Sequence, residues 1–120
     1  MRFLGICLVT DDVPALARFY DRALQTESDI DPIHTSIQTQ GASLAIYSRR
    51  AAERDMQLFF DRRPGGFTLQ FLVDDVQKQW ERLKTLGVEI VREPTVYPWG
   101  SRSMQCKDPD GNLITFASPV

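Results

Sequence analysis

Residues 97–116, YPWGSRSMQCKDPDGNLITF, carry the strongest structural signal in the chain. Within them, residues 108–112 predict a tight turn, because Pro109 presets a turn torsion, Asp110 can bond its own backbone, and Gly111 and Asn112 tolerate positive φ. The residues on both sides of this turn are typical of strands. We therefore predict a β-hairpin whose outgoing strand carries one notable polar residue, Thr115.

Two segments outside this hairpin repeat one pattern, a short apolar strand followed by an amphipathic helix. The strands are predicted over residues 3–9 and 67–73. Two aspartates and a valine follow each strand, and the apolar stripe of the first helix ends at Leu24. Gly87 is expected to terminate the second helix. We interpret the four aspartates as helix caps, not as a carboxylate cluster: Asp11, Asp12, Asp74 and Asp75.

Further short strands follow each helix. Residues 35–39 and 43–47 are predicted strands with Gly41 in the turn between them, and residues 88–91 form another. Residues 49–66 are different, since they are rich in arginine and end in a Pro-Gly-Gly run. We interpret them as a solvated connector with a short helix over residues 51–59.

These patterns predict an α+β fold built from two βαβββ modules. The second pattern lies 63 positions after the first when Asp12 is placed on Asp75. We expect one domain over residues 1–120, with module one at about 1–48, the connector at about 49–66 and module two at about 67–120. Because each sheet has one face still to be covered, the modules are expected to pair into a curved mixed sheet around a concave cup, a common place for a ligand.

The composition excludes several other classes of protein. With 14 basic and 16 acidic residues the formal charge is -2, so no basic surface for nucleic acid is predicted. No apolar run is long enough to span a membrane, and the N-terminus opens into a strand pattern, so a cytoplasmic protein is expected. Cys7 and Cys106 lie in apolar segments without metal-site spacing, and we expect buried free thiols.

Together these features resemble the vicinal oxygen chelate superfamily, which includes glyoxalase I, the extradiol dioxygenases, and the bleomycin and fosfomycin resistance proteins. The resemblance rests on the paired modules, the Phe19-Tyr20 pair in the expected core of the first helix, residues 72–76 and 86–88, and Trp99-Gly100 with the turn at 108–112. It implies a divalent metal held inside the cup by His and Glu side chains of the inner strands. It also implies a homodimer with cups completed across subunits, as in the resistance proteins.

The residues at the implied metal-ligand positions depart from this pattern. The two His positions fall on Gly5 and Thr68, and the two Glu positions fall on Ala45 and Thr115. None of these side chains is a strong ligand for a divalent metal. The single histidine, His34, lies in an irregular segment beside Asp31 and is expected at the surface. We therefore predict no bound metal and no cofactor.

Strand alternation identifies the side chains that share a face with these positions. Cys7 and Phe3 accompany Gly5, Tyr47 accompanies Ala45, Gln70 accompanies Thr68, and Leu113 accompanies Thr115. Such a lining suits stacking and hydrogen bonding and lacks an acid–base pair. The predicted ligand-binding residues are Cys7, Tyr47, Thr68, Gln70, Trp99, Arg102 and Thr115.

Trp99 and Arg102 have alternative interpretations. The indole is either a stacking wall at the mouth of the cup or part of the sheet edge or a dimer contact. Arg102 either holds an anionic ligand or makes a salt bridge with a nearby acid. Phe59 and Phe60 are candidates to cover a groove or a partner subunit.

The leading hypothesis is a metal-free protein of the glyoxalase/bleomycin resistance type that binds a small molecule, as a homodimer, and sequesters an antibiotic or a similar aromatic ligand. The alternative is an enzyme of the same superfamily, a lyase, isomerase or dioxygenase, with a non-standard metal site or none. A third possibility is a structural or regulatory dimer with a filled cup. The identity of the ligand does not follow from the fold.

Overall fold

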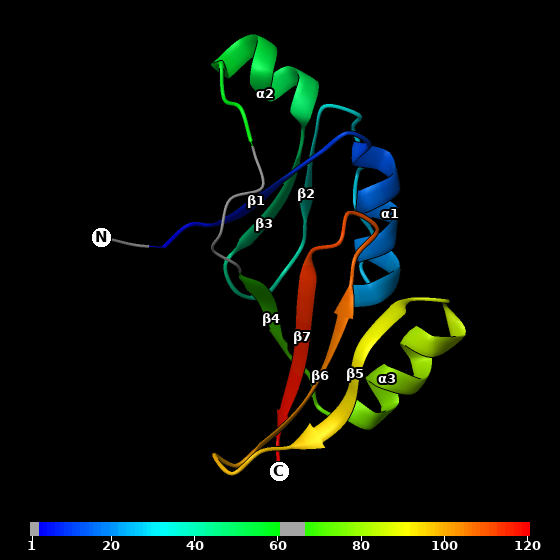
Figure 1. Ribbon diagram of the computed structural model, residues 1–120. Coiled ribbons are helices and arrows are strands. Elements are labelled where there is room, and N and C mark those ends of the chain that lie inside the picture. Colours follow the sequence, from blue (N-terminus) through cyan, green and yellow to red (C-terminus); the bar gives the residue numbers. More distant parts are fainter. Residues whose placement is uncertain (1–2, 61–66) are drawn as a thin grey trace. The chain divides into compact units, whose positions relative to one another are not determined.

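The structure is a computed structural model that describes residues 3–60 and 67–120 (Figure 1). The chain divides into two compact units, Met1–Arg63 and Pro64–Val120. Each unit has its own sheet and its own core.

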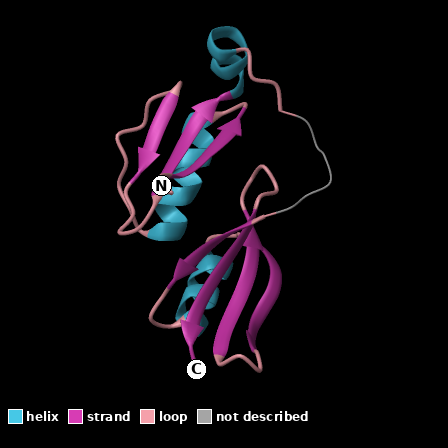
Figure 2. Ribbon diagram, turned by 90° about the vertical axis from the view of Figure 1, so that its left-hand side faces the viewer, coloured by secondary structure: helices cyan, strands magenta, loops and turns pink. Residues whose placement is uncertain are grey.

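The first unit packs one helix against a three-stranded sheet whose strand order is β1-β3-β2. β1 is parallel to β3, and β2 is antiparallel to β3. In Figure 2 α1 lies behind these strands, and its side chains Leu16, Ala17 and Tyr20 are fully buried there. The elements are, in chain order, β1 (Gly5–Thr10), α1 (Val13–Leu24), β2 (His34–Ile37), β3 (Ser43–Ser48) and α2 (Arg49–Met56).

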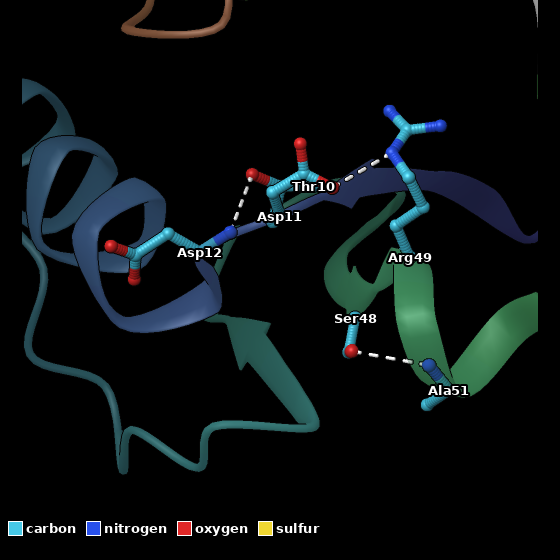
Figure 3. A network of polar contacts seen from close by, with 6 residues as sticks. All are labelled: Thr10, Asp11, Asp12, Ser48, Arg49 and Ala51. Carbon is cyan, nitrogen blue, oxygen red and sulfur yellow. Dashed lines mark hydrogen bonds and ion pairs between the residues drawn. The ribbon is translucent and has the colours of Figure 1, made fainter.

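Side-chain caps begin both helices of this unit, and Figure 3 shows the cap of α2. The Asp12 carboxylate accepts a hydrogen bond from the Ala15 N–H at 3.1 Å, and the Ser48 hydroxyl accepts one from the Ala51 N–H at 3.2 Å. The predicted capping role of Asp11 was wrong. Its carboxylate instead accepts from Arg49 Nε at 3.0 Å, across the gap between the starts of the two helices.

The second unit packs one helix against a four-stranded sheet whose strand order is β4-β7-β6-β5. β4 is parallel to β7, and the other neighbours are antiparallel. In Figure 2 α3 lies behind this sheet, and Leu83 and Phe116 are among the buried residues between them. The elements are, in chain order, β4 (Thr68–Leu72), α3 (Val76–Thr85), β5 (Glu89–Val96), β6 (Ser101–Lys107) and β7 (Leu113–Pro119).

The predicted internal repeat is present in the backbone. Asp75 caps α3 as Asp12 caps α1, and the two cap residues have φ of -142° and -140°. Each carboxylate accepts a hydrogen bond from the backbone N–H of the residue three positions later. Gly87 adopts φ of 74° just after α3, as expected of a helix terminator. The α+β fold in two modules is therefore confirmed.

The first sheet has one strand fewer than the βαβββ pattern requires, within the residues that the structure describes. The counterpart of β5 is missing between α1 and β2. There, side chains take the backbone N–H groups that a strand would pair: Asp21 accepts from Ser28 N at 3.0 Å, and Asp31 accepts from Ile33 N at 2.8 Å. Pro32 lacks an N–H group altogether.

The segment predicted as a solvated connector contains α2, which begins two residues earlier and ends three residues earlier than expected. Ala51 and Ala52 are buried against the first sheet, so this part of the segment contributes to the core of the first unit. Phe59 and Phe60 follow α2 and are exposed. Residues 61–66 of the expected connector lie outside the described residues.

The hairpin at residues 101–119 is confirmed, with β6 and β7 in continuous antiparallel register. Its turn is organised by Asp108, whereas the sequence had assigned this role to Asp110. Oδ1 of Asp108 accepts from the N–H groups of Asp110 and Asn112 at 2.9 and 2.8 Å, and Oδ2 accepts from the Asn112 side-chain amide at 2.7 Å. Gly111 takes the positive φ, 87°, that the turn needs.

Candidate functional site

Each unit has one sheet face that its helix does not cover, and the predicted site residues fall mainly on these two faces. On the first sheet, Cys7 of β1 pairs with Ala45 of β3, which pairs in turn with Ser36 of β2. The neighbouring row contains Tyr47, and the His34 ring lies beside it at 5.9 Å in an edge arrangement. The face therefore carries small side chains in the middle and aromatic rings at one end.

Gly5 is at the position implied for the first metal-binding histidine, and its backbone leaves no room for a side chain. A Cβ atom there would lie 2.0 Å from the backbone oxygen of Ser43, and φ is 155°. The close approach arises where β1 meets β3, since Ser43 N also donates to Leu4 O at 2.9 Å. No ligand side chain fits this position without movement of the strand.

The two thiols lie in different environments. The prediction that both are buried was wrong for Cys7, which is exposed on the open face of the first sheet, and it is confirmed for Cys106. The reason is that β1 has its helix on one side only. Partial burial raises the pKa of the Cys7 thiol. Deep burial raises the pKa of the Cys106 thiol to about 12, and the Asp108 carboxylate adds to that rise.

These environments predict selective alkylation. With iodoacetamide, the native protein should gain one adduct, at Cys7, and Cys106 should react only after unfolding, because its side chain is fully buried. The rate at Cys7 should increase with pH and stay below that of a free thiol near neutrality, since its raised pKa lowers the thiolate fraction. Intact-mass measurement follows the reaction, and Cys7→Ser is the control. Earlier modification of Cys106 would contradict the assignment.

On the second sheet, the open face carries a row of neutral polar side chains across neighbouring strands. Gln70 of β4 pairs with Thr115 of β7, which pairs with Gln105 of β6. The Thr68 and Thr115 hydroxyls lie 2.9 Å apart and share a hydrogen bond. The Gln105 amide donates weakly to Thr115 at 3.5 Å and to the Ser103 hydroxyl at 3.4 Å.

Gln105 and Ser103 are two members of this surface that sequence reasoning did not identify. Strand alternation backward from the 108–112 turn would have placed both on the face of Thr115. In the terminal hairpin, the implied ligand positions fall only on the outgoing strand, β7. The incoming strand contributes the amide.

The strand registers show that the implied metal positions of the first sheet correspond to those of the second. Gly5 and Thr68 begin corresponding strands, and Cys7 pairs with Ala45 as Gln70 pairs with Thr115. The donor set does not fit a divalent metal, since one position excludes a side chain, one is a methyl group and two are hydroxyls bonded to each other. No group of three or more His, Cys, Asp or Glu side chains that could hold a metal occurs in the described residues.

Neither Trp99 nor Arg102 is a member of this polar row. Trp99 sits in the turn between β5 and β6, largely exposed, with its ring stacked on Tyr97 at 4.8 Å and an interplanar angle of 8°. Gly100 permits this turn through its φ of 86°. Arg102 alternates onto the same face of β6 as the buried Met104 and is therefore on the opposite side of the sheet from Thr115.

A family comparison decides the classification. The model of the Glyoxalase/Bleomycin resistance protein/Dioxygenase superfamily matches residues 2–116. The chain belongs to this superfamily. The resemblance expected from the paired modules and the terminal hairpin is thereby confirmed. No curated protein matches the chain significantly in sequence.

Solved structures of this superfamily resemble the chain over nearly its whole length. A glyoxalase/bleomycin resistance protein/dioxygenase family enzyme from Burkholderia phytofirmans PsJN has a TM-score of 0.87 at 20% identity, with 100% of each chain covered. A glyoxalase-related enzyme from Fulvimarina pelagi has a TM-score of 0.82 at 26% identity, covering 98% of this chain and 88% of the other. Lactoylglutathione lyase from Agrobacterium tumefaciens has a TM-score of 0.75 at 19% identity, covering 98% and 92%.

None of the helices in the described residues has the length and apolar character that crossing a membrane would require.

Proposed function

We propose that this superfamily member binds a small molecule without a metal ion, as a homodimer in the cytoplasm, and sequesters an aromatic compound such as an antibiotic. The observation that carries the proposal is that none of the four implied ligand positions holds a metal-binding side chain, and that a Cβ added at Gly5 would lie only 2.0 Å from Ser43 O. A site of this kind recognises its ligand through shape, stacking and hydrogen bonds.

The chemistry of the two open faces supports binding. The first face offers the Tyr47 ring beside small residues, and the second offers the hydroxyls and amides around Thr115. The side chains of Gln70 and Gln105 supply both donors and acceptors for a ligand. No carboxylate or imidazole stands among Thr68, Gln70, Gln105 and Thr115, which favours recognition over proton transfer at this row.

Metal analysis provides the direct test. Protein purified without chelator is expected to contain far less than one equivalent of nickel, zinc, manganese or iron, and EDTA is expected to leave its thermal unfolding midpoint unchanged, because no donor set is lost. Elemental analysis and calorimetry measure these quantities. Near-stoichiometric metal at an internal site would overturn the proposal.

Ligand candidates are then titrated against Trp99 fluorescence in a Trp80→Phe variant, which leaves a single indole reporter.

The alternative is an enzyme of the same superfamily, and it is favoured by the structural relatives that are enzymes, one of them a lyase. One version of it uses shifted metal ligands that include His34. His34→Ala separates the two ideas, since loss of bound metal or of activity in that variant would support the enzyme. Asp31 lies beside His34, and its Oδ1 already accepts from the N–H groups of Ile33 and His34 at 2.8 and 3.2 Å.

A further inference from the structure

β5, the outer strand of the second sheet, contains two irregularities that change which side chains reach the open face. Ile90 pairs with Cys106 and Arg92 with Gln105, so two steps on β5 match one step on β6. A regular ladder would set Arg92 opposite Met104, whose side chain is fully buried. The first bulge therefore moves Arg92 from the helix side of the sheet to the open side.

The second bulge keeps the rest of the strand facing the same way. Between Arg92 and Thr95, three steps on β5 match two steps on β6, so Thr95 pairs with Ser103 on the open face. Its hydroxyl accepts a hydrogen bond from Arg92 Nε at 3.3 Å. The two bulges thus present an arginine and the hydroxyl that orients it on one surface.

Arg92 extends the polar row of the open face to a fourth strand. The row runs from Gln70 through Thr115 and Gln105 to Arg92, one residue from each strand of the sheet. The guanidinium carbon also lies 5.5 Å from the centre of the Tyr97 ring, and Tyr97 stacks on Trp99. The polar row and the aromatic pair are therefore parts of one surface that meet at Arg92.

The charge of Arg92 has no partner on this surface. Glu89 of the same strand stands opposite Lys107 in the register, not opposite a neighbour of Arg92. No carboxylate pairs with the Arg92 guanidinium within residues 3–60 and 67–120, and the side chain is exposed. A guanidinium held by a hydroxyl and an aromatic ring, with its outer N–H groups open, matches the bidentate geometry of a carboxylate.

We infer that Arg92 is an anion-binding residue of the ligand site, and that the ligand combines a planar aromatic ring with an oxyanion such as a carboxylate. This inference rests on the proposed function and defines the class of ligand. The ring stacks on the exposed indole of Trp99, which Tyr97 already holds in place. The oxyanion of the ligand accepts hydrogen bonds from Arg92, and the Gln105 amide forms a hydrogen bond with a neighbouring polar group of the ligand.

A pair of probes that differ only in charge tests this assignment. 2-Naphthoate and 2-naphthamide are titrated into isotope-labelled protein at low ionic strength, and amide chemical shifts in β5, β6 and β7 report binding. The naphthoate is expected to bind about tenfold more tightly, since a hydrogen bond to a charged group of this kind is worth about one such factor. Added salt should reduce the preference, because the pair is exposed.

The variants assign the preference to a residue. Arg92→Met should make the two probes bind equally, and Arg92→Lys should keep only part of the preference, because an ammonium lacks the guanidinium fork. Arg18→Met is the matched control, since Arg18 is an exposed arginine of α1 in the other unit, and it should keep the full preference.

The outcomes separate this inference from the proposed function. Equal binding of both probes at the open face, or a preference that survives Arg92→Met, overturns the role of Arg92 and leaves metal-free binding intact. A preference lost in Arg102→Met but kept in Arg92→Met has the same consequence. Absence of any shift on this face with either probe, at millimolar concentration, overturns both.

Discussion

Replacing Gly5 with alanine is expected to destabilise the protein by about 3 kcal/mol or more, through overpacking against backbone and loss of a backbone conformation suited to glycine. The Cβ would stand 2.0 Å from the Ser43 backbone oxygen, a separation that requires movement of β1 or β3. Movement there breaks the hydrogen bond from Ser43 N to Leu4 O. Urea unfolding followed by circular dichroism measures the change in free energy.

Gly41 offers a matched control for this substitution in the same unit. It lies in the loop between β2 and β3, and a Cβ there would meet nothing within 4 Å. Gly41→Ala is therefore expected to be neutral or to stabilise by about 0.5 kcal/mol through the unfolded state. Equal effects of the two substitutions would show that the contact between β1 and β3 at Gly5 is not as close as described.

The Gly5 result bears on the chemistry as well as on stability. If alanine is not tolerated, a histidine at this position is not tolerated either, because every side chain begins with the same Cβ. The metal site implied by the superfamily could then not be restored by substituting the four positions alone. The backbone of β1 would itself then exclude the metal site that the superfamily implies.

Replacing Asp108 with alanine is expected to destabilise the protein by about 3 kcal/mol, because it removes a buried carboxylate that accepts three hydrogen bonds from the turn. The Asp108 side chain accepts from Asp110 N, Asn112 N and the Asn112 amide, and the residue is only 4% exposed. The turn it holds joins β6 to β7, the central pair of the second sheet. The same urea experiment measures the effect.

Two variants give this prediction its specificity. Asp108→Asn keeps one oxygen for the backbone N–H groups and loses the charge, so a smaller cost of about 1 kcal/mol is expected. Asp110→Ala removes an exposed carboxylate and should change stability by no more than about 0.5 kcal/mol. A larger effect at Asp110 than at Asp108 would restore the assignment made from sequence and contradict the hydrogen bonds of the structure.

Local chemistry explains why much of the fold was predictable. The caps at Asp12 and Asp75, the terminator Gly87 and the 108–112 turn act over a few residues, so their signals are written in adjacent positions. The absence of a strand before β2 was not predicted. This absence depends on hydrogen bonds between side chains such as Asp21 and backbone N–H groups several positions away.

The candidate site was predictable only where the strands are regular. Alternation correctly placed Thr68, Gln70 and Thr115 on one face, since these lie on β4 and β7 in unbroken register. It gave no indication of Arg92, whose face is set by the bulge between Ile90 and Arg92, whereas Pro94 marks only the second bulge. Arg102, chosen from its closeness to Trp99 in sequence, alternates to the other side of the sheet.

The sequence by itself determined the family, the two modules, the capped helices and the terminal hairpin, and it showed that the implied metal ligands are replaced. Each of these depends on residue type and short-range spacing. The tertiary structure alone decided that Gly5 has no space for a side chain, that Asp108 holds the turn, and that Arg92 joins the polar row. These features depend on which strands become neighbours and in what register, and that is set by contacts between residues far apart in the chain.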